Sequence, residues 1–139
     1  MIKLTETMLW VRDQDEALAF YTGKLGFELR GDVTMPEMNN FRWLTVGPVG
    51  QPDVALMLQP IHPRLDPETL EQLRSLMAKG RLGTLFLTTD DCYGDYEELT
   101  SRGVEFTEPP EERPFGIDSA FRDPSGTQIR MTEHREPAG

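Results

Sequence analysis

Residues 4–28 read LTETMLWVRDQDEALAFYTGKLGFE, and the first third of this segment alternates in polarity. In an extended chain, successive side chains point to opposite sides. The alternation over residues 4–12 therefore predicts a β-strand with two unlike faces. The two faces carry Leu9 and Val11 on one side, and Glu6, Met8 and Trp10 on the other.

An amphipathic helix is predicted to follow this strand. Its start is marked by Asp13 or Asp15, either of which can accept a hydrogen bond from the first free backbone N–H groups. Gly26 marks its end, because glycine often adopts the left-handed conformation just past a helix. Apolar side chains three and four positions apart form one stripe along it. They are Ala17, Phe20 and Tyr21.

Three further strands complete the first half of the chain. They are predicted at residues 27–33, 40–46 and 54–58. A turn is expected at residues 47–51, which contain two glycines and a proline. The first 60 residues therefore give the order strand, helix, three strands.

The second half repeats this order. A strand at residues 84–88 is followed by a helix that Asp90 or Asp91 can cap and Gly103 ends. The separation from Asp90 to Gly103 is 13 positions, the same as from Asp13 to Gly26. Further strands are predicted at 104–106, 119–121 and 128–132. The last two form a hairpin around Asp123-Pro124-Ser125-Gly126, which is typical of a type I turn. The repeat indicates two similar modules.

A separate amphipathic helix is predicted between the halves. Asp66-Pro67 is typical of a helix start, with a capping side chain followed by proline at the first helical position. Lys79-Gly80 is typical of a helix end. Its apolar face consists of Leu70, Leu73, Leu76 and Met77.

Composition narrows the classes of partner. The 139 residues carry a net charge of −10, which disfavours nucleic acid and anionic membrane surfaces as partners. The single cysteine, Cys92, excludes an intrachain disulfide and fits a reducing compartment. No apolar run approaches the roughly 18 residues that a membrane helix needs, and residues 1–10 do not resemble a signal peptide. We therefore expect a cytoplasmic protein.

The quoted segments resemble the glyoxalase, bleomycin-resistance and extradiol dioxygenase superfamily. MLWVRD at 8–13, ALAFY at 17–21 and LGF at 25–27 are similar to the first module of glyoxalase I-like proteins. FRDPSGTQI at 121–129 is similar to their closing hairpin. The matches span nearly the whole chain in the correct order.

The resemblance implies an α+β fold of two βαβββ modules that form a curved mixed sheet with an open cavity. The implied modules are residues 1–60 and 81–139, joined by a connecting helix at 61–80 within one structural domain. Many members of the family are dimers, so we expect a homodimer. Whether the modules pair within the chain or across the dimer stays open.

The resemblance also places the family's metal ligands. Enzymes of the family usually carry one ligand on the first and last strand of each module, which here falls at Glu6, Ala55, Thr84 and Arg130. Alanine has no donor atom, and arginine stays protonated and repels a cation. We therefore expect no metal and no other cofactor. The two histidines, outside the predicted sheets, are His62 and His134.

Two of these positions suggest a different site. Glu6 and Arg130 occupy places that converge on one ion in the relatives, so we hypothesise that they form an ion pair in the metal's place. Alternatively, Arg130 receives an anionic group of a ligand, or both side chains are simply solvated.

The cavity face is otherwise expected to be apolar. Such a surface with a few polar groups suits a small organic ligand, although the same side chains could instead fill the cleft as core. The predicted ligand-binding residues are Met8, Trp10, Trp43, Met57, Thr84, Phe86 and Gln128.

The leading hypothesis is a metal-independent protein that binds a small apolar or aromatic molecule, with an anionic group as one option, for sequestration or resistance. Three alternatives stay open. In the first, Glu6 is a general base and Arg130 stabilises an oxyanion in a metal-free lyase, epimerase or dioxygenase of the same superfamily. In the second, the protein is a metalloenzyme with ligands elsewhere. In the third, it is a dimeric interaction module without a ligand.

Overall fold

The structure is a computed structural model that describes residues 1–61 and 64–136. It confirms the predicted α+β fold, with the strand–helix–three-strand order in both halves. The first module consists of β1 (Glu6–Val11), α1 (Gln14–Leu18), the π-helical turn η1 (Ala19–Lys24), β2 (Glu28–Met35), the 3₁₀ turn η2 (Pro36–Met38), β3 (Phe41–Gly47) and β4 (Ala55–Pro60).

The second module follows a connecting helix, α2 (Pro67–Ala78), as predicted. It consists of β5 (Thr84–Thr88), α3 (Cys92–Ser101), β6 (Phe106–Arg113), β7 (Gly116–Arg122) and β8 (Gln128–His134). Within the described residues, no helix is long and apolar enough to cross a membrane.

The helix boundaries follow from the predicted caps. The carboxylates of Asp13, Asp66 and Asp91 each accept a hydrogen bond from the backbone N–H three residues on, at 2.8, 2.9 and 3.0 Å. Gly26 and Gly103 have φ values of 77° and 91°, so both adopt the left-handed conformation that favours glycine. The first helix differs from the prediction, because it widens into a π-turn after Leu18.

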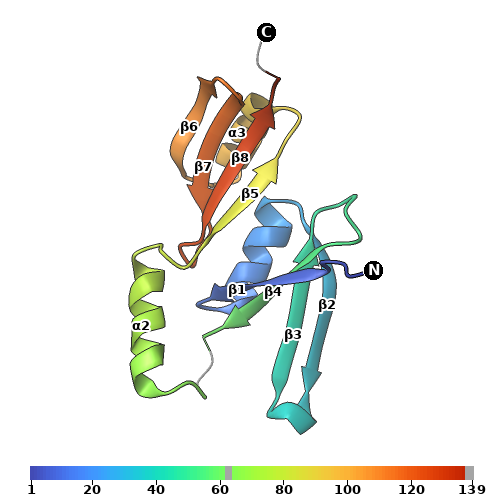
Figure 1. Ribbon diagram of the computed structural model, residues 1–139, viewed down its shortest axis with the longest axis vertical. Coiled ribbons are helices and arrows are strands. Elements are labelled where there is room, and N and C mark those ends of the chain that lie inside the picture. Colours follow the sequence, from blue (N-terminus) through green and yellow to red (C-terminus); the bar gives the residue numbers. More distant parts are fainter. Residues whose placement is uncertain (62–63, 137–139) are drawn as a thin grey trace.

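Each module forms its own four-stranded sheet (Figure 1). The strand orders are β1-β4-β3-β2 and β5-β8-β7-β6, so the first and last strands of each module lie side by side and parallel. This register sets Glu6 beside Ala55 and Thr84 beside Gln128. The second sheet lies above the first along the long axis of the molecule (Figure 1).

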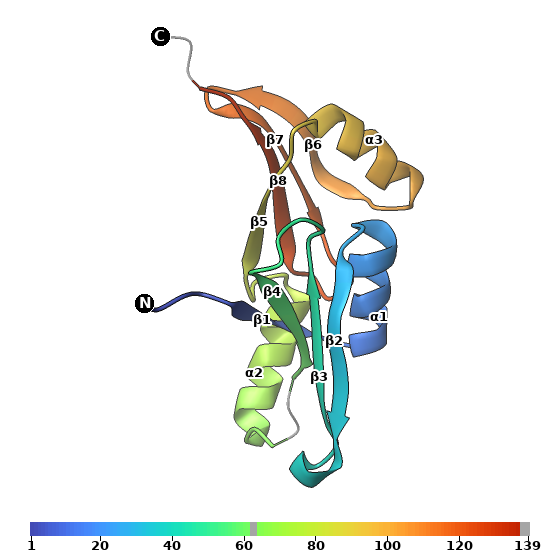
Figure 2. The same cartoon turned by 90° about the vertical axis from the view of Figure 1, so that its right-hand side faces the viewer.

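A single hydrophobic core joins the two modules on the helix side of the sheets. Figure 2 shows α1 and α3 on that same side. The core includes Leu44 and Leu58 of the first module and Phe121 and Ile129 of the second. The rings of Phe20 and Phe121 lie 6.4 Å apart across the module boundary.

A buried hydrogen bond reinforces this boundary. The Tyr21 hydroxyl donates to Asp123 Oδ2 at 2.8 Å, across 102 sequence positions. The other oxygen of Asp123 accepts from the backbone N–H groups of Ser125 and Thr127, both at 2.9 Å. Burial raises the pKa of the Asp123 carboxyl and the pKa of the Tyr21 hydroxyl. Asp123, predicted as a turn residue, therefore also connects the modules.

The opposite faces of both sheets are left uncovered. Phe86 is 78% exposed, Met8 39% and Trp43 38%, which is unusual for large apolar side chains in the middle of strands. These are the faces on which the sequence places the ligand-binding residues. Because they do not close over each other within the chain, core filling does not account for them.

Candidate functional site

The open face of the first sheet is apolar. The sheet register sets Met8 beside Met57, and Met57 beside Thr45. Trp10 and Trp43 lie two positions from these residues along their strands, so they belong to the same face. The structure thus brings together Met8, Trp10, Trp43 and Met57, as predicted. We call this surface the apolar face.

Two further residues of the apolar face were missed from the sequence. Phe41 lies two positions before Trp43, and their rings meet edge to face at 6.0 Å. Val33 lies directly opposite Trp43 on β2 and is exposed. The signal was present in the alternation of residues 41–47, which indicates that Phe41, Trp43 and Thr45 share one side.

The open face of the second sheet is mainly polar. Its register places Thr84 beside Gln128 and Phe86 beside Arg130, so these four predicted residues do lie together. Gln128 Nε2 donates to the Gly80 carbonyl oxygen at 3.0 Å, which holds the start of the α2–β5 connection against β8. We call this surface the polar face.

Arg130 is fixed by two acids of its own sheet. Its Nε lies 3.0 Å from Asp118 Oδ2, and its Nη2 lies 2.7 Å from Glu108 Oε2. The second oxygen of Asp118 accepts from the Thr132 hydroxyl at 2.8 Å. Asp118 is buried and Glu108 is half exposed. One guanidinium therefore faces two carboxylates on the polar face.

The hypothesised ion pair between Glu6 and Arg130 is wrong for this chain. Glu6 is exposed at the start of β1 on the first sheet, and it lies within salt-bridge distance of no cation in the described residues. Arg130 lies on the second sheet and pairs with Glu108 and Asp118 instead. The hypothesis failed because it did not foresee the two acids of the second sheet that hold Arg130.

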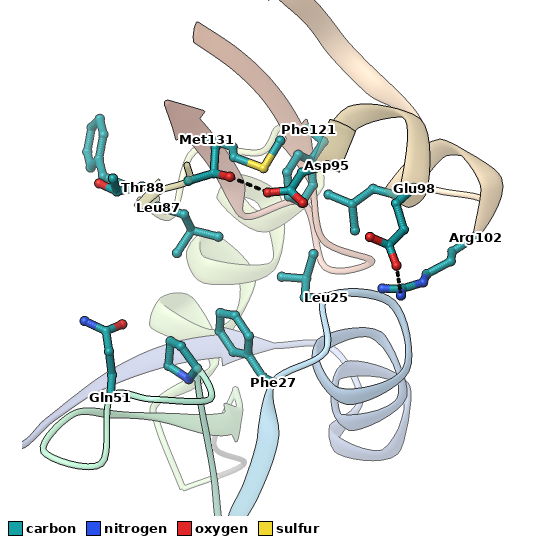
Figure 3. A pocket seen from close by; sticks show the side chains of 14 residues that line it. Leu25, Phe27, Gln51, Leu87, Thr88, Asp95, Glu98, Arg102, Phe121 and Met131 are labelled. Carbon is teal, nitrogen blue, oxygen red and sulfur yellow. Dashed lines mark hydrogen bonds and ion pairs between the residues drawn. The ribbon is translucent and has the colours of Figure 1, made fainter. Parts of the chain in front are cut away.

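The junction of the modules contains a groove of about 450 Å³ (Figure 3). Leu25, Phe27 and Leu87 surround its apolar part, while Asp95, Glu98 and Arg102 of α3 lie along one side. Asp95 accepts a hydrogen bond from the Thr89 hydroxyl, and Glu98 pairs with Arg102 at 2.5 Å.

A smaller cavity of about 240 Å³ continues this groove between the edges of β1 and β5. Glu6, Ala55 and Phe86 all contribute to its walls. Most of its lining is apolar, including Leu4, Leu56 and Leu85. The two edge strands thus approach each other without pairing and leave apolar surface between them.

Arg30 holds the loop that walls both cavities. It is the extra residue of a β-bulge in β2, a device that redirects a side chain. Its guanidinium donates to the backbone carbonyl oxygens of Pro48, Gln51, Pro52 and Val54 at 2.8–3.4 Å. One side chain therefore binds four backbone carbonyl groups of the loop.

Replacing this arginine should loosen the loop. In Arg30→Lys, the compact ammonium group cannot bond all four carbonyl groups, because it lacks the planar, widely spaced donors of a guanidinium. We expect the free energy of unfolding to fall by about 1–2 kcal/mol and the hydrogen-bonded amides of Gln51 and Val54 to exchange faster with deuterium. Arg113→Lys, which alters an exposed ion pair with Glu111, is the control. Equal exchange at Gln51 and Val54 in both variants would contradict this role.

The positions carried over from metal-binding relatives are divided between the sheets. Glu6 and Ala55 lie on the first, and Thr84 and Arg130 on the second. Within residues 1–61 and 64–136, no three His, Cys, Asp or Glu side chains gather as a metal site would require. His134 was predicted to lie outside the sheets, but it is the last residue of β8, where it is exposed. His62 lies outside the described residues.

Cys92 is a buried structural residue. Its side chain is fully buried, and its thiol contacts Ser119 Oγ at 3.5 Å and the Met131 carbonyl oxygen at 3.7 Å. Burial raises the pKa of this thiol, which opposes formation of the reactive thiolate.

Comparison with known proteins decides the family. The family model of the Glyoxalase/Bleomycin resistance protein/Dioxygenase superfamily matches residues 3–131. The chain belongs to this superfamily. Among its relatives, YurT of Bacillus subtilis (strain 168) is 34% identical over 133 residues, which are 95% of this chain and 99% of YurT.

Two solved structures of the superfamily fold are especially similar. UcmS2 has a TM-score of 0.89 and 41% identity, over 96% of this chain and 98% of UcmS2. TnmS3, an antibiotic binding protein from Streptomyces sp. CB03234, has a TM-score of 0.75 and 30% identity, over 97% of this chain and 98% of TnmS3. A protein described as antibiotic binding therefore lies among the structural neighbours of this chain.

Proposed function

We propose that this superfamily member is a metal-independent, cytoplasmic homodimer that binds a small aromatic or apolar molecule and sequesters it. The ligand lies between the apolar face of one protomer and the polar face of its partner. In this arrangement each dimer holds two equivalent sites, because a two-fold axis repeats every contact.

The exposure of the two open faces carries this proposal. An aromatic side chain exposed to 78%, as Phe86 is, costs free energy in water unless a ligand or partner covers it. The apolar face adds two tryptophans and two methionines, side chains that suit flat or irregular organic molecules. Within one chain the two faces approach each other at the edges of β1 and β5, where Glu6 and Phe86 line the smaller cavity, and a second copy would cover the remainder of each face.

The likeness to TnmS3 supports the choice of ligand class. That protein is described as antibiotic binding, and it aligns over nearly the whole of both chains. Fold similarity alone would not indicate a ligand. Here it coincides with uncovered aromatic side chains on the sheet faces that the superfamily uses for its cavity.

Binding and assembly are tested together. We expect light scattering at micromolar concentration to give the mass of a dimer, and a screen of aromatic antibiotics to raise the melting temperature through native-state binding. If the protein is a dimer that no aromatic compound stabilises, the result would favour the alternative of an interaction module without a ligand. A monomer that binds with full affinity would contradict the shared site.

Metal analysis tests the other part of the proposal. Because the four carried-over positions offer one carboxylate, one hydroxyl, one methyl and one cation, we expect iron, zinc and nickel well below one ion per chain. Chelator treatment should leave both ligand affinity and melting temperature unchanged. Metal independence would be overturned if stoichiometric metal survived dialysis and its removal by a chelator also abolished ligand binding or activity.

A further inference from the structure

The charges on the two open faces are not balanced. On the polar face, Arg130 is surrounded by Glu108 and Asp118, so this group carries one excess negative charge. On the apolar face, Glu6 has no cationic partner in the described part of the chain. Both faces that contribute to the proposed cavity thus present carboxylate to a ligand.

Arg113, near the β6–β7 turn, pairs with Glu111. Arg122 is a further cation on the polar face, next to Gln128. Its guanidinium lies against the backbone at Gly80, where an added Cβ would come within 3.3 Å of Arg122 Cζ. It is therefore directed toward the end of α2, away from the row of Phe86 and Arg130. The middle of the polar face keeps its excess of carboxylate.

The aromatic side chains favour the same sign of charge. The faces of tryptophan and phenylalanine rings are negative, and they attract cations within about 6 Å of their centres. Trp43 and Phe41 on one face, and Phe86 on the other, are exposed or half-buried and available to a ligand. Aromatic surface and carboxylate together suit a positively charged aromatic compound. An anion would instead meet the half-exposed carboxylate of Glu108 beside Arg130.

We propose that the cavity selects aromatic ligands that carry a positive charge, with Glu108 and Glu6 as specificity-determining residues. This inference rests on the proposed function, since it names the ligand class of the same site. It replaces the expectation that Arg130 receives an anionic group. Arg130 instead holds the side chains of the two acids in place, and its positive charge is compensated by theirs.

Three probes of one shape test the inference at pH 7.5: 9-aminoacridine as the cation, acridine as the neutral compound and acridine-9-carboxylate as the anion. We expect fluorescence titration to give the affinity order cation, neutral, anion, with about tenfold or more between the first and last. An anion that binds as tightly as the cation would overturn the inference. If none of the three binds, the proposed function fails as well.

Variants assign the selectivity to the site. Glu108→Gln, at a half-exposed position, should reduce the cation-to-anion ratio by about threefold or more, and Glu6→Gln should act in the same direction. Glu97→Gln makes the same change in net charge at an exposed position of α3, on the other side of the sheet, and should leave the ratio unaltered. If Glu108→Gln and Glu97→Gln changed the ratio equally, the selectivity would arise from the net charge of the chain and not from the site. If the anion binds and Arg122→Gln abolishes that binding, Arg122 is the group that receives the ligand and the inference is overturned.

Discussion

Asp123→Ala is expected to lower the free energy of unfolding by about 3–5 kcal/mol, the largest stability effect of any single change considered. The substitution removes the acceptor of three hydrogen bonds, from Tyr21 Oη, Ser125 N and Thr127 N. All three donors are then left in a buried environment, where an unpaired polar group costs more than an exposed one. Chemical denaturation monitored by circular dichroism measures the loss.

Two companion variants separate the contributions of Asp123. Asp123→Asn keeps an acceptor for the two backbone N–H groups, so we expect it to lose less stability than Asp123→Ala. Asp90→Ala removes an exposed carboxylate shortly after β5 and should change stability by less than about 0.5 kcal/mol. If Asp123→Ala behaved like Asp90→Ala, the connection between the modules would not depend on Asp123.

Phe86→Ala is expected to weaken ligand binding by about 10- to 100-fold. Covering an exposed phenylalanine side chain contributes about 1.5–3 kcal/mol, and the variant removes that contribution from the complex. Because Phe86 is outside the core of the chain, the free energy of unfolding at a fixed low protein concentration should change little. Isothermal titration with a compound found in the thermal screen measures the affinity.

Phe115→Ala is the matched control, because Phe115 is also an exposed phenylalanine, at 47%, but lies in the β6–β7 turn away from both open faces. It should bind the ligand with wild-type affinity. A loss of affinity that is equal in both variants would place the ligand elsewhere than on the polar face.

Local structure was largely predictable from the sequence because its determinants are close together along the chain. The caps at Asp13, Asp66 and Asp91 each act over three residues. The strand β6 was predicted only at its start, since its sequence FTEPPEER contains two prolines and four charges. Its position as an edge strand with register shifts tolerates those prolines.

The site was predictable only in part because its geometry depends on distant contacts. Alternation correctly grouped Met8 with Trp10, and Thr84 with Phe86, on their strand faces. It did not indicate that Glu108 and Asp118 would hold Arg130, since these residues lie on strands whose register the sequence does not specify. The partner of Tyr21, 102 positions away, was equally beyond reach of local patterns.

A mixture of two binding-deficient variants tests the shared site most directly. Trp43→Ala damages the apolar face and Phe86→Ala the polar face, and both side chains are exposed enough to be replaced without loss of fold. In a mixed dimer, one site carries both defects and the other carries none. Unfolding and refolding the variants together produces mixed dimers, which native mass spectrometry can count.

If the ligand lies between protomers, the equimolar mixture regains wild-type affinity at about a quarter of the sites, because half of the dimers are mixed and each restores one site. Neither variant alone shows such sites. If the mixture binds no better than the two variants measured separately, although mixed dimers are present, the site lies within one chain and the account is wrong.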